Sequence, residues 1–358
     1  MDFNLTEDRR MLAETLNRYL ADQYGAAHRE QVAYAAPFHD PQKWREIADL
    51  GILQALAPET AGGFGGAGFD ITVVFEALGR ALCPEPVLPT LMASRLLAAA
   101  GVEQGALLDG TMRYGVGLGE LESPYALDQI ETHAENGRLS GRKSVIYGGN
   151  DADRFLVAAR NGPGIAVYEV LATDAQVKGY GLIDGGGAAE LFLENTPARL
   201  LMKDAGGAVN DALDAGALAL CGEAVGLMDV TLQTLLEYLR TRKQFGRTIG
   251  SFQALQHRVV DMVTEIEQSR SITILAASRM GADDQSRSVS MAKNLIGRTA
   301  KLVAEETIQM HGGIAMTWEA PVSHYAKRLT MLDHQLGDTD EHLERVMAGY
   351  VKSQAAPG

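Results

Sequence analysis

The segment that decides the fold reads Arg242-Lys243-Gln244-Phe245-Gly246, followed by Ile249 and Phe252-Gln253. It closes one amphipathic helical pattern and opens the next, so we expect it to form a corner between two helices. The corner carries a guanidinium, a carboxamide and an aromatic ring, with a second carboxamide seven residues after Gly246. These groups suit the binding of a dinucleotide pyrophosphate, because a guanidinium donates in a fixed fork to phosphate oxygens.

Length and charge limit the class of protein. The chain of 358 residues exceeds one ordinary compact core, so two or three domains are expected. The formal net charge of -14 repels nucleic acid, which we therefore do not expect as a partner. The same field repels anionic ligands at long range. Phosphate binding must then depend on local groups such as Arg242 and Lys243.

Hydropathy and cysteine content indicate the compartment. Apolar residues make up 46% of the chain, which is typical of a soluble globular protein. No run of about 18 apolar residues occurs, so no membrane association is expected. The first residues have neither the basic nor the apolar part of a secretion signal. Cys83 and Cys221 form no Cys-x-x-Cys pair, so we expect reduced thiols and a cytoplasmic location.

Periodicity divides the chain into three regions. Residues 1–107 follow helical spacing, with Thr6 as the expected N-cap of the first helix. Residues 108–203 change to a period of two, with strands expected at 114–118, 139–147, 154–159, 165–170 and 188–193. Residues 204–358 return to helical spacing. We expect a multidomain α and β fold with a helical N-terminal domain, a central antiparallel β-barrel or sandwich, and a C-terminal helical bundle.

The sequence does not support three common kinds of functional site. Gly63–Gly68 matches Gly-x-Gly-x-x-Gly, but such a dinucleotide loop must leave a buried strand, and none is indicated before it. We interpret it as a flexible loop between helices. The eight histidines show no metal-ligand spacing, so no metal site is expected. The chain also has no Gly-x-Ser-x-Gly nucleophile elbow.

A second glycine-containing turn ends a long helical pattern at Gln309-Met310-His311-Gly312-Gly313. Two glycines after a helix can form a plain C-cap. Together with the corner some 65 residues earlier, they also fit a ligand site. Glycines let a backbone approach a ligand closely, and Gln309 adds an amide able to contact ribose or phosphate.

These motifs together resemble the acyl-CoA dehydrogenase family. The resemblance is carried by Arg242–Gly246, Phe252-Gln253, Asp261-Met262, Gln309–Gly313 with Glu319 and Pro321, and by Pro58-Glu59 with Gly62–Gly65 in the N-terminal region. It covers essentially the whole chain. It implies three domains, at 1–107, 108–203 and 204–358, the last a four-helix bundle, and assembly as a dimer or tetramer with FAD at subunit interfaces.

The resemblance also implies a set of contacts to the FAD of a neighbouring subunit. The positions that match the family's motifs are Arg242, Gln244, Phe245, Gln253, Gln309, Gly312 and Gly313. The implied reaction removes a proton from Cα of an acyl-CoA thioester and passes a hydride from Cβ to the flavin. An electron-transfer flavoprotein is the expected electron acceptor.

The catalytic base of the family is missing from both of its usual positions. Counting forward from Glu319 and Pro321, the usual glutamate position falls on Leu336, and the alternative on an earlier bundle helix falls on Gly216. Neither side chain can accept a proton. Asp338, Asp214 and Asp333 are the nearest carboxylates, and nothing in the sequence favours one. The catalytic residue is therefore unknown.

The central region departs from the family as well. Glycine, in Gly119-Glu120-Leu121-Glu122-Ser123, stands where the family often has a threonine that contacts the flavin ring. After Gly141-Arg142-Lys143, the family's Trp-x-Thr segment is replaced by Val145 and Tyr147. The altered positions would serve the chain's own site, whereas the positions that reach a neighbour are retained.

Three hypotheses follow from this division. The chain is one half of a heterotetramer, lending FAD contacts to a partner subunit that carries the glutamate. Alternatively, it forms a homodimer or homotetramer with a displaced base. In the third hypothesis it is a non-catalytic subunit that binds acyl-CoA or a partner. Paired small and large subunits of this family act on bulky steroid-like or dicarboxylic thioesters. The sequence does not specify the acyl group.

Overall fold

The computed structural model describes residues 5–162 and 164–355, and the chain folds into two compact units. Unit 1 consists of Met1–Ala26, Ile71–Cys83 and Ala217–Gly358, and unit 2 of Ala27–Asp70 and Pro84–Gly216. Helices occupy most of the first and last regions of the sequence, and the strands of the large sheet fall between Tyr114 and Met202. The two boundaries between the three expected domains, at 107 and 203, stay a prediction, because the compact units interleave along the chain.

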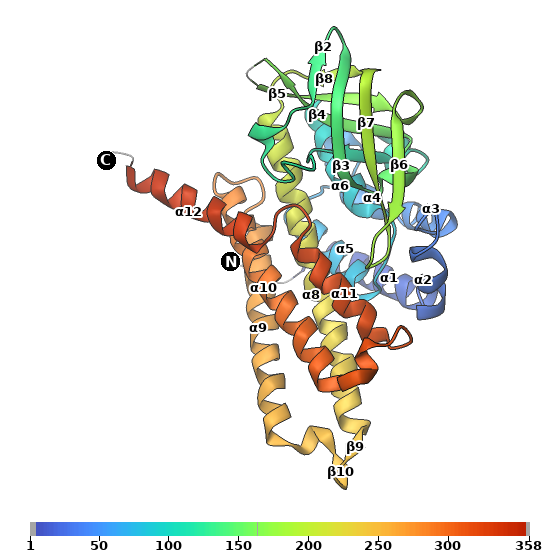
Figure 1. The fold of residues 1–358 in the computed structure, drawn as a ribbon, viewed down its shortest axis with the longest axis vertical. Coiled ribbons are helices and arrows are strands. Elements are labelled where there is room, and N and C mark those ends of the chain that lie inside the picture. The colour runs from blue at the N-terminus through green and yellow to red at the C-terminus, as the bar shows by residue number, and fades with distance from the viewer. Residues whose placement is uncertain (1–4, 163, 356–358) are drawn as a thin grey trace. The chain divides into compact units, whose positions relative to one another are not determined.

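Unit 1 is helical. Its helices are α1 (Glu7–Gln23), most of α5 (Gly68–Arg80) and of α8 (Gly206–Thr241), α9 (Gln253–Ser278), α10 (Gln285–His311), α11 (Pro321–Asp333) and α12 (Thr339–Ala355). Thr6 caps α1 as expected, since its hydroxyl accepts a hydrogen bond from the Arg9 amide. Val289, Ile296 and Val303 recur every seven residues on the buried face of α10, which packs against α9, α11 and α12. These long helices form the C-terminal bundle (Figure 1).

Helices α5 and α8 approach closely inside unit 1. A side chain at Gly79 would collide with the Glu223 carbonyl, and one at Gly226 with the Glu76 carbonyl. Glycine at these positions therefore lets the two backbones touch. An ion pair between Asp229 of α8 and Arg270 of α9, with 2.6 Å between oxygen and nitrogen, joins the next helix to this pair.

Unit 2 combines short helices with a sheet. The helices are α2 (Ala26–Ala33), α3 (Pro41–Asp49), α4 (Ile52–Ala55), α6 (Val87–Ala99) and α7 (Gly105–Leu108). The strands are β1 (Tyr114–Gly117), β2 (His133–Glu135), β3 (Arg138–Tyr147), β4 (Arg154–Asn161), β5 (Gly164–Leu171), β6 (Gln176–Gly181), β7 (Gly187–Pro197) and β8 (Arg199–Met202).

The eight strands form one mixed sheet in the order β6-β7-β3-β2-β4-β5-β8, with β1 paired to β4. The expected antiparallel pairing is therefore only partly correct, because β1 and β2 both run parallel to β4. Alternation of apolar residues identifies a strand but carries no information on the direction of its neighbour. The sequence also missed β2, β6 and β8, which are short and largely exposed or half-buried.

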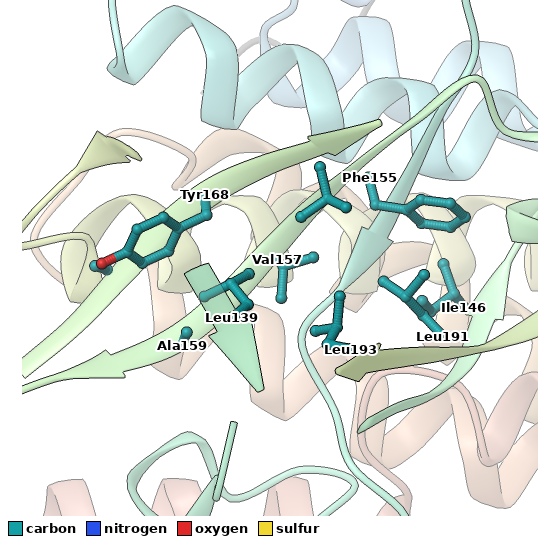
Figure 2. Close-up of a cluster of buried hydrophobic side chains, with 10 residues drawn as sticks. Leu139, Ile146, Phe155, Val157, Ala159, Tyr168, Leu191 and Leu193 are labelled. Carbon is teal, nitrogen blue, oxygen red and sulfur yellow. The ribbon is translucent and has the colours of Figure 1, made fainter. Parts of the chain in front are cut away.

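The core of the sheet is a cluster of buried apolar side chains from β3, β4, β5 and β7, shown in Figure 2. Phe155, Val157 and Leu191 are completely buried within it. Burying one such side chain stabilises a fold by about 1.5–3 kcal/mol. The inward residues alternate along β4 and β5, which is the period-two pattern of the sequence.

The glycine-rich segment at residues 62–67 connects two helices, as expected. Helix α4 and the short 3-10 helix Glu59–Ala61 precede it, and α5 follows. No described strand leads into it. Gly63–Gly68 therefore lacks the preceding strand that a dinucleotide-binding loop requires.

One described helix, α8, is long and apolar enough to cross a membrane by length and composition. However, 83% of its most apolar window is buried within the protein. Core helices of soluble proteins have the same composition.

Candidate functional site

The corner at residue 245 is a tight β-hairpin. Strands β9 (Lys243–Gln244) and β10 (Arg247–Thr248) pair antiparallel between α8 and α9, at the end of the bundle (Figure 1). Phe245 and Gly246 form the two-residue turn, with φ of 52° and 78°. Positive φ at both central residues is the signature of a type I′ turn. The Phe245 side chain is 89% exposed, so the hairpin displays this ring instead of burying it.

Two contacts bring the glycine turn to the same end of unit 1 as the hairpin. The Tyr238 ring, near the end of α8, stacks on His311 at the end of α10, with 4.4 Å between ring centres. The Tyr238 hydroxyl also donates a hydrogen bond to the His311 carbonyl. The ion pair between Arg258 of α9 and Glu306 of α10 joins the third helix to this end.

All seven residues predicted to contact FAD are therefore placed at one end of unit 1, and all seven are exposed: Arg242, Gln244, Phe245, Gln253, Gln309, Gly312 and Gly313. Gly312 also caps α10, since its amide donates to the Ile308 carbonyl. The C-cap interpretation and the ligand interpretation of this turn are thus compatible. A Cβ added at Gly312 or Gly313 would meet no atom within 4 Å, so the backbone there is open to a ligand.

The hairpin end is locally basic. Arg240, Arg242, Lys243 and Arg247 lie within eight residues, and residues 240–253 contain no acid, in a chain of net charge -14. Among the described residues none forms an ion pair with these four side chains. The guanidinium and the carboxamides can donate hydrogen bonds to phosphate and ribose oxygens, and the open glycines leave room for them. The residues present thus fit the pyrophosphate part of a dinucleotide such as FAD.

The position of the expected glutamate lies in the turn between α11 and α12. Leu336 has a φ of 57°, and its carbonyl accepts a hydrogen bond from His342 Nε2. The fully buried ammonium group of Lys293 donates to the carbonyls of Leu332, Asp333 and Gly337 at 2.8–3.0 Å. Burial lowers the pKa of Lys293 and, with the nearby Lys293 charge, lowers that of His342 to about 3. This turn is thus held by buried polar groups.

The contacts of the three aspartates considered as displaced bases differ from one another. Asp333 accepts hydrogen bonds from the Thr339 amide and hydroxyl, and Asp338 accepts one from the Glu341 amide. Both carboxylates therefore cap the start of α12. Asp214 is buried within α8, as is Gly216 two residues later. None of these observations identifies a catalytic base.

The segment at Gly119 is closed on itself. Glu120 and Ser123 exchange backbone hydrogen bonds, and a Cβ at Gly119 would lie 2.6 Å from the Pro124 carbonyl oxygen. A threonine does not fit there in this conformation. Gly119 therefore does not supply the hydroxyl that the family resemblance assigns to the flavin ring at this position.

A buried ion pair, which sequence reasoning missed, fixes the same segment. Lys143 Nζ is completely buried and lies 2.7 Å from Glu120, and it also donates to the Leu118 carbonyl. Burial alone would raise the pKa of Glu120, but hydrogen bonds from the Glu131 amide, Lys143 and the Thr132 amide hold it at about 2. Burial lowers the pKa of Lys143 to about 8. The available signal was the inward register of Lys143 in a strand otherwise apolar on that face.

The backbone bulges next to this pair. The register of β3 against β7 shifts between Lys143 and Ile146, and Val145 adopts a φ of 51°. Glu190 accepts hydrogen bonds from the Ser144 hydroxyl and the Val145 amide. Positive φ at a β-branched residue is a genuine outlier, which is held here by a carboxylate from the neighbouring strand. Val145 and Tyr147 are the residues that the resemblance sets against the family's Trp-x-Thr segment.

Comparison with known proteins gives two matching family descriptions. The acyl-CoA dehydrogenase N-terminal domain matches residues 6–105, and the acyl-CoA dehydrogenase C-terminal domain matches residues 206–350. Acyl-CoA dehydrogenase IpdE2 of Mycobacterium tuberculosis is 30% identical over 326 residues, which cover 90% of this chain and 91% of that protein.

Two solved structures of the same fold are similar over the whole chain. A variant of the Tcur3481-Tcur3483 steroid ACAD superposes with a TM-score of 0.90 at 27% identity, covering 98% of this chain and 99% of that one. The ChsE4-ChsE5 complex from Mycobacterium tuberculosis gives a TM-score of 0.90 at 26% identity, covering all of both chains.

Proposed function

The chain belongs to the acyl-CoA dehydrogenase family, and we propose that it serves as the subunit of a heteromeric enzyme that lends FAD contacts to a partner carrying the catalytic glutamate. Members of this family are FAD-containing oxidoreductases that act on CH–CH bonds in fatty acid or steroid degradation. The observation that supports the proposal is a contrast within the chain. The basic hairpin end is intact and exposed, whereas Leu336 occupies the expected position of the base.

In this proposal, Arg242 and Gln244 donate to the phosphates of an FAD held mainly by the partner. Gln253 and Gln309 add carboxamide donors, Phe245 covers the nucleotide, and Gly312 and Gly313 leave room for it. When bound, FAD supplies the hydride acceptor for α,β-dehydrogenation of an acyl-CoA thioester. The proton at Cα goes to the partner's glutamate, because a leucine cannot accept it.

The closed segment at Gly119 supports the same assignment. A chain that held a flavin ring in the family's manner would need a hydroxyl there, and the Pro124 carbonyl excludes the side chain that would carry it. We therefore infer that this chain does not contribute the residues that hold the flavin ring.

The relatives indicate the class of partner and substrate. Each of the two structures above is named as a pair of proteins, and one is described as a steroid ACAD. We propose a heterotetramer that acts on a bulky, steroid-like acyl-CoA in the cytoplasm, with an electron-transfer flavoprotein as the acceptor.

Absorption spectroscopy separates this function from the alternatives. The full chain is purified alone and after co-expression with a glutamate-bearing family member, and the flavin bands are recorded before and after addition of acyl-CoA thioesters. We expect a colourless chain alone and a yellow pair that the substrate bleaches. If the chain purified alone is yellow and the acyl-CoA thioester bleaches it, the enzyme is a homomer with a displaced base. A chain that stays inert in both tests yet binds acyl-CoA would be a non-catalytic subunit.

Substitution at the hairpin tests the FAD contacts directly. Arg242→Ala in the assembled pair removes the guanidinium that we propose to bind the FAD phosphates. It should release most of the FAD, which is measured as the ratio of flavin absorbance to protein absorbance. Arg240→Ala is the matched control, since it removes an exposed arginine two residues away, outside the motif. Unchanged flavin content in the Arg242→Ala protein would reject the contact.

A further inference from the structure

The ring of Phe252, just before α9, contacts two residues of the hairpin. The guanidinium carbon of Arg247 lies 4.0 Å from the centre of this ring. Phe245 meets the same ring edge-on, with centroids 6.1 Å apart and an interplanar angle of 86°. Both geometries are favourable for an aromatic ring, whose face attracts cations and whose edge suits a T-shaped pair. Phe252 thereby connects both residues to the start of α9.

The turn itself is not the conformation that its residues prefer. A type I′ turn favours Asn-Gly, and phenylalanine at positive φ is disfavoured by contacts of its Cβ. Burial does not compensate, because Phe245 is the most exposed of the large apolar side chains described. A strained backbone that persists without a packing reason is typical of functional sites.

The hairpin also fixes the backbone of Arg242. The Ile249 amide donates to the Arg242 carbonyl at 2.9 Å, and the Arg242 amide donates to the Tyr238 carbonyl at 2.8 Å. The orientation of the Arg242 side chain thus depends on how firmly β9, β10 and the residues before α9 hold together. The two residue pairs of β9 and β10 alone make a marginal hairpin in water.

We propose that Arg247 and Phe252 are positioning residues, which stack to hold the hairpin so that Arg242 and Gln244 face the dinucleotide phosphates. This inference rests on the proposed function. The stack lowers the conformational entropy that the hairpin would otherwise lose on binding, which is how preorganisation raises affinity. Arginine is suited to this position because its planar group stacks on a ring, whereas lysine is a compact point charge.

The test uses the full chain in its FAD-binding assembly, with Phe252→Leu, Arg247→Ala and Arg247→Lys as the variants. Two quantities are measured: amide hydrogen exchange of residues 241–250, and the FAD dissociation constant from flavin fluorescence. We expect Phe252→Leu and Arg247→Ala to speed exchange at the hairpin and to weaken FAD binding about two- to fivefold, the range for an exposed cation–π contact. Arg247→Lys should restore part of both.

Two controls separate the stack from charge and from turn geometry. Lys243→Ala removes a cation from the same hairpin but no described ring contact, so it should leave the amide exchange of the hairpin unchanged. Phe245→Asn supplies the residue that a type I′ turn prefers while removing the edge-on ring. Because Phe245 is also a proposed FAD contact, only the amide exchange of the hairpin is compared in this variant, and it should stay slower than in Phe252→Leu.

The outcomes distinguish this inference from the function on which it rests. If Phe252→Leu and Arg247→Ala bind FAD as the unmodified assembly does while Arg242→Ala loses it, the positioning role is wrong and the FAD contact stands. If Arg242→Ala also retains FAD, both are wrong. Weaker FAD binding accompanied by faster hairpin exchange in the two stack variants, with partial rescue by Arg247→Lys, supports the inference.

Discussion

Single residues limit what the central region of this chain can bind. At Gly119 the missing side chain leaves room for the Pro124 carbonyl, and the Glu120 carboxylate turns inward to Lys143. A buried ion pair stabilises only when its remaining hydrogen bonds are satisfied, and Glu120 also accepts from two backbone amides. The polar groups of this segment that are named here therefore already have hydrogen-bond partners within the protein.

Gly119→Ala tests how firmly the segment keeps this conformation. The added methyl would lie 2.6 Å from the Pro124 carbonyl oxygen, so the segment must shift, and we expect a loss of about 1–3 kcal/mol in the free energy of unfolding. Gly164→Ala is the control, because a Cβ there meets nothing within 4 Å. Urea unfolding followed by circular dichroism measures both. Equal midpoints for the two variants would show that the segment opens easily.

At the scale of elements, a buried histidine joins three segments of unit 2. His39 Nδ1 lies 3.2 Å from Glu85, before α6, and Nε2 lies 2.9 Å from Asp151, after β3. A neutral imidazole has one N–H, so two facing carboxylates favour the doubly protonated ring. Burial alone would lower the pKa of His39, but Glu85 and Asp151 outweigh it and the pKa is raised. Arg113 and the Asp40 amide face the same carboxylates.

The raised pKa predicts a pH dependence of stability. A group whose pKa is higher in the folded state contributes stability fully below its unfolded pKa, about 6.5 for histidine, and loses it as the pH rises through the folded value. We expect the melting temperature to fall as the pH rises above 6.5, and His39→Gln to remove most of that dependence. His133→Gln, at an exposed histidine on β2, should leave it intact. A pH profile shared by the unmodified protein and His39→Gln would contradict the assignment.

At the scale of the whole molecule, the question is where the proton acceptor resides. In a heteromer it belongs to the partner, whereas in a homomer it must be a carboxylate of this chain. Asp333 and Asp338 are already helix caps, and asparagine caps a helix about as well as aspartate. Substitution by asparagine therefore removes basicity at little structural cost.

Asp333→Asn, Asp338→Asn and Asp214→Asn should each leave the kcat of the assembled enzyme within about twofold, if the base is the partner's. Loss of a general base typically lowers the rate by about 10²–10⁴-fold. Steady-state kinetics with an acyl-CoA thioester distinguishes the two ranges, and thermal melting checks that each variant is folded. A loss of the larger size in one folded variant would identify a displaced base and overturn the heteromer.

Much of this protein could be predicted from its sequence because the relevant signals are local. Helical spacing, the Thr6 cap and the alternation along β3, β4, β5 and β7 depend on near neighbours in the chain. The family also followed from short motifs, since Arg242–Gly246 and Gln309–Gly313 are contiguous. The parallel pairing of β1 and β2 with β4 was missed, because strand direction depends on partners distant in sequence.

Local patterns were enough to identify the family, the class of each region and the residues expected to contact FAD. Folding adds three facts that no local pattern carries: these residues share one exposed end of unit 1, Pro124 excludes a side chain at Gly119, and Lys143 and Lys293 are buried on specific partners. The two kinds of information differ in the distance along the chain over which they act. Propensity, capping and periodicity act over a few residues, whereas the environment of a buried charge or of a glycine is set by atoms that meet only when distant segments pack together.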